Sequence, residues 1–527
     1  MKKFLKILIT DFKINIILLF ILNIITNLLI ILIPYINGKF LNSLIQIENI
    51  KKIQLFGILL IFSLIISGIS DILYSYIYSI TSEKLQFTLK FKIINKLRKI
   101  SYIEFKKFDT SYLYQRIEQD TITCCDFILS NIFTSFINLL KLLIILTLIF
   151  NINIYLFIYT ICILPIYFVI FSLFRKPLKD KNFKIREVQN KYYSTMNEQL
   201  THMYNIKIDS NYEKENKNLK LFFSKYINNF KEYMGLISIF NLSQNSIALI
   251  FQIITIIIGI YFIIKKQMTV GSLVVVSSYF NITENTIKYY YNLAKDYVSF
   301  KVANKRNEEL LNFKEEQNGT KLIDKIYELH GNITYGYDKT LFKNLKIDLQ
   351  LSDILYIVGE NGSGKTTLIQ ILNGIISNEN IHIKLNDINY SDINLLNLRK
   401  NNISNVPQNI YICDMKVKDY LKNIDMADDF ILNFIKSNED KDIKNLSGGD
   451  LQFLMLIHKL FTNKQLIILD EPTSNLDINR ISWLKEYIKR TRKERIYVII
   501  THSKDEIIEN SKIIYFGKEN LYEKNNY

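Results

Sequence analysis

A short glycine-rich stretch in the last third of the chain has the composition of a phosphate-binding loop. Residues 357–368 read IVGENGSGKTTL and contain the pattern GxxxxGKT. The strand-like run ILYIV precedes the loop and the helix-like run TTLIQILNG follows it, so backbone N–H groups can turn inward around phosphates. Lys365 would reach the β- and γ-phosphates, and the Thr366 hydroxyl would bind Mg²⁺. The expected phosphate-contacting residues are Gly359, Glu360, Asn361, Gly362, Ser363, Gly364, Lys365, Thr366 and Thr367.

Two adjacent carboxylates end a second apolar run, LIILDE. At the end of a buried strand, Asp470 can hold Mg²⁺ through water, and Glu471 can polarise a water that attacks a phosphoryl group. A third apolar run, IYVIITHS, brings His502 to the same relative position after its strand. We therefore expect Glu471 and His502 to be the catalytic residues of a nucleotide-hydrolysing site.

The segment LSGGD, residues 446–450, resembles the signature motif of ATP-binding cassette (ABC) proteins, in which LSGGQ is usual. The resemblance implies that two cassettes bind two ATP molecules head to tail. Ser447, Gly448 and Gly449 would then contact the γ-phosphate of the ATP that the partner cassette holds. Asp450 departs from the pattern: an acid is favourable in the first turn of a helix, but it brings negative charge towards a phosphate and could weaken closure. The helical segment between Gln408 and the signature is also short for an exporter.

Other family positions occur in the expected order. Gln408 in NVPQN resembles the Q-loop, Asp477 in SNLD the D-loop, and His502 the switch histidine. Tyr337 is similar to the aromatic residue that stacks on adenine, with Tyr335 as the alternative. The resemblance implies ATP and Mg²⁺ as cofactors and a hydrolytically competent site. The expected metal ligands are Thr366, Gln408 and Asp470.

The first 300 residues have a different character. The chain has 527 residues, of which 49% are hydrophobic and 22% charged, and apolar runs of membrane-spanning length, about 20 residues, recur before residue 300. We expect a multidomain protein: an all-α, six-helix transmembrane domain of ABC exporter type, followed by an α/β P-loop NTPase cassette. The expected domains are residues 1–311 and 320–527, joined by a linker at 312–319. The six runs lie near 15–36, 55–78, 127–150, 153–174, 240–264 and 271–296.

Basic residues predict the orientation of these spans. They concentrate in the N-terminal segment and in the connections after the second and fourth runs, which the positive-inside rule places in the cytoplasm. We therefore expect a multi-pass protein of the cell membrane whose termini and cassette are cytoplasmic. The first run is too long for a cleaved signal peptide. The net charge of +16 comes with no nucleic-acid-binding motif, so no nucleic-acid partner is expected.

Charged groups inside the spans are the best indication of cargo. Lys141 lies in the third run, and Glu284 and Lys288 lie one helical turn apart in the sixth. Either Glu284 and Lys288 pair with each other and Lys141 extends towards the membrane surface, or these groups line a cavity with tyrosines 289–291. The second alternative favours export of a small peptide or amphipathic compound. A lipid or multidrug exporter, an importer with the same fold, and a non-transporting membrane regulatory ATPase remain alternatives.

The resemblance extends to the membrane half and implies a half-transporter. Residues 105–120 are similar to the first intracellular loop of exporters, 206–214 to the second coupling segment, and 268–310 to the sixth helix. A second half-transporter is then required, with a homodimer favoured and a heterodimer possible, in a lipid bilayer. Because no cysteine-protease domain precedes the first run, leader cleavage by this chain is not expected.

Overall fold

The chain folds into two compact units. The computed structural model describes residues 10–45, 50–108, 110–336, 340–408, 414–422, 428–516 and 521–524. The first unit comprises Met1–Asn95 and Ser111–Asn312, and the second comprises Lys96–Thr110 and Phe313–Tyr527. Residues 96–110, expected in the membrane half, thus belong to the cassette unit. The expected linker also packs there, because the Glu316 backbone N–H donates to the Lys99 carbonyl at 2.7 Å.

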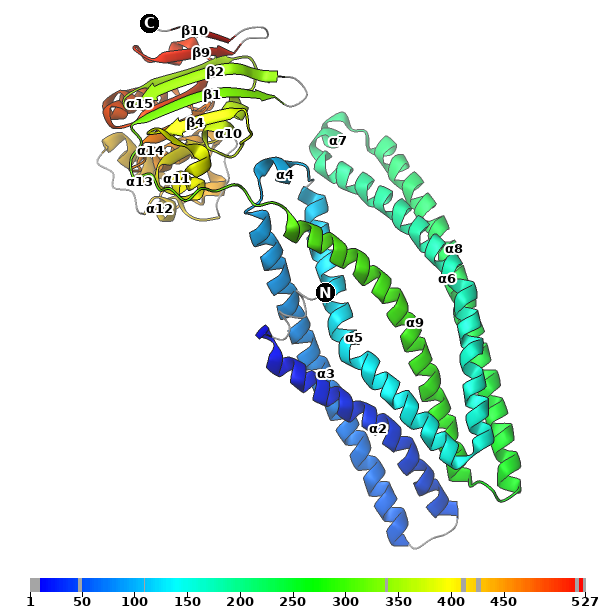
Figure 1. The fold of residues 1–527 in the computed structure, drawn as a ribbon. Helices are drawn as coiled ribbons and strands as arrows, with labels where there is room; N and C mark the ends of the chain where they lie inside the picture. The colour runs from blue at the N-terminus through cyan, green and yellow to red at the C-terminus, as the bar shows by residue number, and fades with distance from the viewer. Residues whose placement is uncertain are drawn as a thin grey trace. The chain divides into compact units, whose positions relative to one another are not determined.

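The first unit is helical throughout the residues described (Figure 1). Five of the helices described, including the apolar part of α5 at 116–152, are long and apolar enough to cross a membrane. The sixth predicted span also forms a helix, α9, but it does not reach that standard, since Glu284, Lys288 and many hydroxyl groups interrupt its apolar surface. The helices are α2 (Lys13–Ile45), α3 (Ile50–Leu97), α5 (Thr110–Ile152), α6 (Ile154–Thr201), α7 (Met203–Asp209), α8 (Tyr212–Ile264) and α9 (Val270–Asn312).

Local chemistry explains two junctions in this unit. The predicted turn at 151–153 is confirmed: α5 ends at Ile152, and the Asn153 side chain accepts hydrogen bonds from the first N–H groups of α6. Helices α2 and α9 approach closely at two glycines, where a Cβ on Gly271 would lie 2.0 Å from the Gly38 carbonyl oxygen. Asn42 also accepts a hydrogen bond from the Gly271 N–H at 2.8 Å. Small residues therefore bring these two backbones together.

The cassette is built on two sheets. The larger has the strand order β10-β9-β3-β8-β7-β6, and its pairs are parallel except for β10 with β9. The three apolar runs predicted as buried parallel strands are confirmed as β3 (Ile354–Gly359), β7 (Leu466–Asp470) and β8 (Ile496–Thr501). Its other strands are β6 (Ile403–Val406), β9 (Lys512–Phe516) and β10 (Leu521–Lys524). The smaller, antiparallel sheet contains β1 (Glu328–Gly336), β2 (Thr340–Gln350), β4 (Ile381–Leu385) and β5 (Ile388–Asn389).

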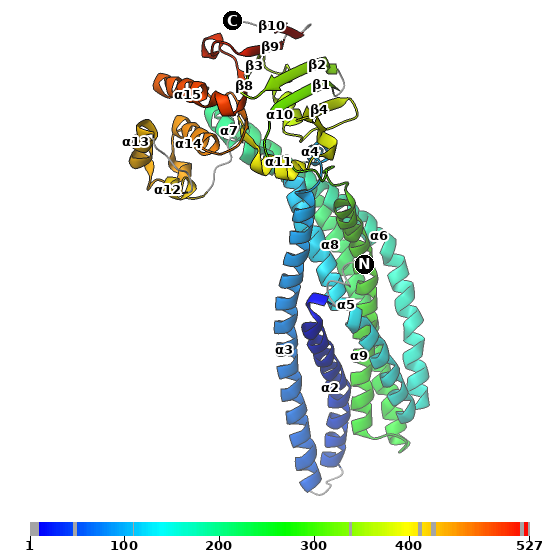
Figure 2. The ribbon, with the colours of Figure 1, turned by 60° about the vertical axis from the view of Figure 1, so that its left-hand side comes forward.

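Both faces of the larger sheet are covered, as a parallel sheet requires. Along β3, Leu355 and Ile357 enter one core, which includes α10, whereas Ile354 and Tyr356 enter a second core. The second core contains α13, α14 and α15, which lie together in Figure 2. The remaining element of this unit, α4 (Tyr102–Lys106), packs Ile103 against the first core. The cassette helices are α10 (Lys365–Leu372), α11 (Leu395–Asn401), α12 (Val417–Tyr420), α13 (Asp429–Asn438), α14 (Gly448–Leu460) and α15 (Ile478–Thr491).

Candidate nucleotide site

The glycine-rich loop joins β3 to α10 in the predicted strand–loop–helix order. Gly362 and Gly364 have φ angles of 81° and 100°, a region that glycine enters without the steric cost of a Cβ. The ammonium group of Lys365 donates hydrogen bonds to the carbonyl oxygens of Gly359 at 2.7 Å and Glu360 at 2.9 Å. The lysine is thus held over the loop, where its charge can meet a phosphate.

The donors of the loop fit a triphosphate. The Ser363 hydroxyl oxygen is buried and has no hydrogen-bond partner, a costly arrangement that a phosphate oxygen would relieve. No side chain caps the N-terminus of α10, so its first N–H groups are available to an anion. Thr366 is exposed in the first turn of α10, where its hydroxyl can reach a metal bound to the phosphates.

Register between β7 and β8 brings the catalytic candidates together. Asp470 pairs with Ile500 across the two parallel strands, so the residues that follow, Glu471 and His502, leave the sheet at the same edge. Nε2 of His502 lies 2.7 Å from Oε1 of Glu471, and Nε2 of Gln408 donates to Oε2 of Glu471 at 3.0 Å. A carboxylate that is ionised only accepts hydrogen bonds, so His502 can orient it by donating from Nε2 in the tautomer that carries a proton there. Two residues predicted from separate motifs, His502 and Gln408, thus contact the carboxylate of a third, Glu471.

Burial and neighbouring charges set the electrostatics of this edge. Burial, followed by the Glu471 charge, raises the pKa of Asp470 to about 6, against the opposing effects of Lys365 and His502. Burial lowers the pKa of Lys365, which the charges of Glu471 and Asp470 oppose. Glu471 itself has a φ of 50°, a left-handed conformation that is uncommon for a side-chain-bearing residue and is found at functional sites.

The residues expected to hold Mg²⁺ form an incomplete set by themselves. Within the described part of the chain, no group of three or more His, Cys, Asp or Glu residues could hold a metal ion. Thr366, Gln408 and Asp470 offer a hydroxyl, an amide and one buried carboxylate. This suits Mg²⁺, which is commonly bound through one or two carboxylates together with substrate phosphates and water.

The adenine-stacking residue is not placed. Tyr337 lies outside the described residues. Its alternative, Tyr335, is 6% exposed and belongs to the first core of the cassette. The Tyr335 ring therefore contributes to packing and presents no open face to a base.

The signature motif begins helix α14. Ser447 caps the helix, since its hydroxyl accepts from the Asp450 N–H at 3.2 Å. Ser447 and Gly448 are exposed, and a Cβ on Gly448 would have no heavy atom within 4 Å. Gly449 differs: a Cβ there would lie 2.5 Å from the carbonyl oxygen of Asn475. Gly448 thus leaves space beside the backbone for a ligand, whereas Gly449 packs against the D-loop.

Two residues that contact the candidate site were not predicted from the sequence. Gln452 donates to the Glu471 carbonyl at 2.9 Å and accepts from the Asn475 amide at 3.0 Å, which ties α14 to the turn that carries Glu471. Its signal in the sequence was that Gln452 is the only polar residue in the run 451–457. Arg480 pairs with Asp450 at 2.6 Å, and no local sequence pattern indicated that pairing. Asp477, which was predicted, caps α15 and lies 3.2 Å from the same arginine.

The charged groups predicted to indicate cargo have polar partners in the structure. Lys288 contacts Glu284 at 2.6 Å, and Lys141 donates to the Asn27 side chain at 3.0 Å. Tyr289 and Tyr290 donate to Asn131 and Ser135 at 3.0 and 2.7 Å. In this conformation, these groups therefore make contacts within the helical unit, as expected if they serve structure.

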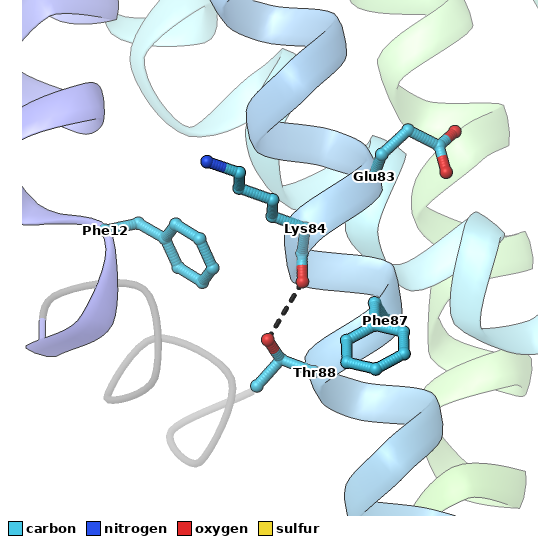
Figure 3. Close-up of a pocket in the computed structure, with 5 residues that line it drawn as sticks. All are labelled: Phe12, Glu83, Lys84, Phe87 and Thr88. Carbon is cyan, nitrogen blue, oxygen red and sulfur yellow. Dashed lines mark hydrogen bonds between the residues drawn. The ribbon is translucent and has the colours of Figure 1, made fainter.

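An open pocket of the same unit contains none of the predicted site residues (Figure 3). It lies beside α3, where Lys84, Phe87 and Thr88 line it together with Phe12, and Thr88 donates to the Lys84 carbonyl. It adds no convergent polar groups to the chemistry described above.

Comparison with known proteins agrees with this architecture. Residues 16–287 match the model of the ABC transporter transmembrane region, and residues 342–474 match the ABC transporter model. In a solved structure of a bacterial Atm1-family ABC exporter with ATP bound, the fold agrees with a TM-score of 0.80 over 97% of this chain and 94% of that chain, at 16% identity.

Two relatives have related names. The lacticin-481/lactococcin-DR transport/processing ATP-binding protein of Lactococcus lactis is 28% identical over 76% of this chain. The pediocin PA-1 transport/processing ATP-binding protein of Pediococcus acidilactici is 26% identical over 69% of this chain. The matched parts span only 60% and 55% of those two proteins. With a transmembrane region covering half of its length and a cassette after it, the chain belongs to the ABC transporter family.

Proposed function

We propose that this chain is one half of an ATP-driven exporter. The observation that carries the proposal is the shared carboxylate of Glu471, held by His502 at 2.7 Å and Gln408 at 3.0 Å. A cassette without hydrolytic activity would have no need to orient that carboxylate from two sides. Because the same chain contains a transmembrane region, the process driven by ATP hydrolysis would be transport across the membrane.

The residues divide the chemistry between them. The loop N–H groups and Lys365 bind the phosphates, and Asp470 with Thr366 and Gln408 would hold Mg²⁺, which neutralises charge on the phosphates. Glu471 orients the attacking water and accepts its proton as the new P–O bond forms and the bond from the γ-phosphorus to ADP breaks. His502, through its N–H, fixes the Glu471 carboxylate. The products are ADP and inorganic phosphate.

Two chains are needed for each pair of nucleotides in this proposal. The exposed Ser447 and the open side of Gly448 supply hydroxyl and backbone donors at a helix N-terminus, where a partner's γ-phosphate would be bound. A homodimer is favoured because this one chain carries both halves of the site, and a second, different half-transporter could take the same place. Loop charges support a cell-membrane protein with both termini and the cassette in the cytoplasm.

The proposed cargo is a small peptide or amphipathic compound. The names of the two relatives refer to transport and processing of lacticin-481, lactococcin-DR and pediocin PA-1, which supports this class. Glu284 and Lys288 fit this class, because an acidic and a basic side chain lie one turn apart in α9, the sixth predicted span, and charged groups inside a membrane commonly mark a transport path.

Flux measurements in proteoliposomes test the proposal. Candidate peptides, a fluorescent lipid and a cationic dye are offered to vesicles whose cassettes face outward, with ATP outside. We expect ATP-dependent accumulation of peptide in the lumen and stimulation of ATP hydrolysis by the same peptide. Accumulation of lipid or dye alone would change the cargo class, and movement out of the lumen would indicate an importer. Hydrolysis without flux of any compound would contradict a transporter.

A further inference from the structure

The aspartate of the signature motif is held by an arginine from another helix. Nη2 of Arg480, on α15, lies 2.6 Å from Oδ1 of Asp450, and Nε lies 3.2 Å from Oδ2 of Asp477. The guanidinium group also stacks near the rings of Phe453 and Phe434, at 5.0 and 5.4 Å. Because only 19% of the Arg480 side chain and 26% of the Asp450 side chain are exposed, this pair is fixed by its surroundings and not a loose surface contact.

The same aspartate engages the signature serine. The Ser447 hydroxyl donates to Oδ2 of Asp450 at 2.7 Å and accepts from the Asp450 N–H. A hydroxyl has one proton, so a proton given to Asp450 is not available to a phosphate. Burial acts to raise the pKa of Asp450, but the Ser447 hydrogen bond and Arg480 outweigh it and the pKa is lowered. The carboxylate is therefore negative at neutral pH, beside the motif that an ATP phosphate must approach.

We propose that Arg480 is a positioning residue for nucleotide closure, which cancels the charge of Asp450 and lets a chain with aspartate in its signature motif bind a partner's γ-phosphate. The proposal rests on the two-cassette arrangement proposed above. Without Arg480, the approaching phosphate would meet an uncompensated carboxylate. With it, the carboxylate is drawn towards α15, and the Ser447 hydroxyl can exchange Asp450 for the phosphate as its acceptor.

Arg480 also lies where the signature and the D-loop meet. A Cβ on Gly449 would be 2.5 Å from the Asn475 carbonyl oxygen and 3.6 Å from Nη1 of Arg480, and Asp477 begins the helix that carries the arginine. One guanidinium group thus joins the signature aspartate to the D-loop aspartate. A change in position at either motif is transmitted to the other through this group.

Charge rescue in the full-length protein in lipid tests the proposal. The variants are Arg480→Ala, Arg480→Gln, Asp450→Asn and the double variant Arg480→Gln with Asp450→Asn. We expect each single Arg480 substitution to raise KM for ATP by roughly fivefold, as for a half-buried charge pair, with a smaller change in kcat. The Asp450→Asn variant should have a lower KM, because it leaves a positive charge near the phosphate. The double variant should return KM to within about twofold of the unsubstituted protein.

A matched control removes an equal charge elsewhere on the same helix. Arg490→Ala, whose side chain is 65% exposed and lies 3.8 Å from Asp428, should leave KM for ATP unchanged. An unchanged KM in both Arg480 variants would overturn the proposal. A double variant with a KM as high as that of Arg480→Gln would also overturn it, because Arg480 would then act only by packing on Phe434 and Phe453. If the unsubstituted protein and Arg490→Ala bound ATP but neither hydrolysed it nor associated, the proposed function itself would fail.

Discussion

At the scale of single residues, the Glu471 carboxylate is the centre of the site. Its two oxygens contact His502 and Gln408, so the orientation of this group is fixed from two sides. We expect Glu471→Gln to lower kcat for ATP hydrolysis by at least about 100-fold, the usual contribution of a positioned general base, while ATP binding persists. Steady-state phosphate release and retention of radiolabelled ATP measure the two effects.

Glu494→Gln serves as a control for that substitution, since this exposed glutamate lies outside the nucleotide site. It should hydrolyse ATP at the unsubstituted rate. Turnover retained in Glu471→Gln would assign the base to another group.

The buried Asp470 makes stability depend on pH. Its pKa rises from 3.8 to about 6 on folding, so the folded state binds a proton more tightly than the unfolded state. The stabilisation is full below pH 4 and is lost as pH rises through 6, by about 3 kcal/mol at most. We therefore expect Asp470→Asn to raise Tm relative to the unsubstituted protein at pH 7 and 8, without nucleotide, and by less at pH 5.

Nucleotide binding should reverse that difference. Mg²⁺ with ATP favours the ionised carboxylate, so the unsubstituted protein should gain Tm on adding both, and Asp470→Asn should gain little. A Tm difference between the two proteins that is constant from pH 5 to 8 would show that Asp470 has an ordinary pKa.

At the scale of elements, the contact between α2 and α9 depends on two glycines. A Cβ on Gly271 would lie 2.0 Å from the Gly38 carbonyl oxygen, and neither backbone can give way without separating the helices. We expect Gly271→Ala to lower the free energy of unfolding by about 1–3 kcal/mol, the typical cost of overpacking. The Tm of the purified protein in detergent measures the effect.

Gly68→Ala is the matched control within α3, where a Cβ would meet no atom within 4 Å. Alanine is the better helix former there, so its Tm should be equal or slightly higher. Equal Tm values for the two variants would mean that α2 and α9 adjust without cost.

At the scale of the whole molecule, the proposal requires two chains around two nucleotides. In a Glu471→Gln background with Mg²⁺ and ATP, native mass spectrometry should show two chains with two bound nucleotides. Adding Lys365→Ala, which removes the loop's charge, should abolish the bound nucleotide. A single chain that retains one ATP would contradict the arrangement in which Ser447 serves the partner's site.

Much of this protein could be predicted because its key features are local. The GxxxxGKT loop needs glycines at fixed positions, and a membrane helix needs about 20 consecutive apolar residues. Strands β3, β7 and β8 are short apolar runs, the first leading into the loop and the other two ending beside a carboxylate or a histidine. The predicted turn at 151–153 followed from its uncharged asparagines, and Asn153 is indeed the cap of α6. Sequence-based prediction was less accurate at α9. The length of this segment indicated a membrane span, but the helix is less apolar than the five candidate spans.

The sequence by itself determined the order of the two halves and the position of the phosphate loop, and it predicted which carboxylate is catalytic, because each of these depends on neighbours within one helix or strand. Only the tertiary structure decided that Arg480 pairs with Asp450, that Gln452 ties α14 to Glu471, and that residues 96–110 belong with the cassette. These contacts join residues 19 to 30 positions apart or segments more than 200 apart. Partnership at such separations is set by packing and strand register, which no local pattern encodes.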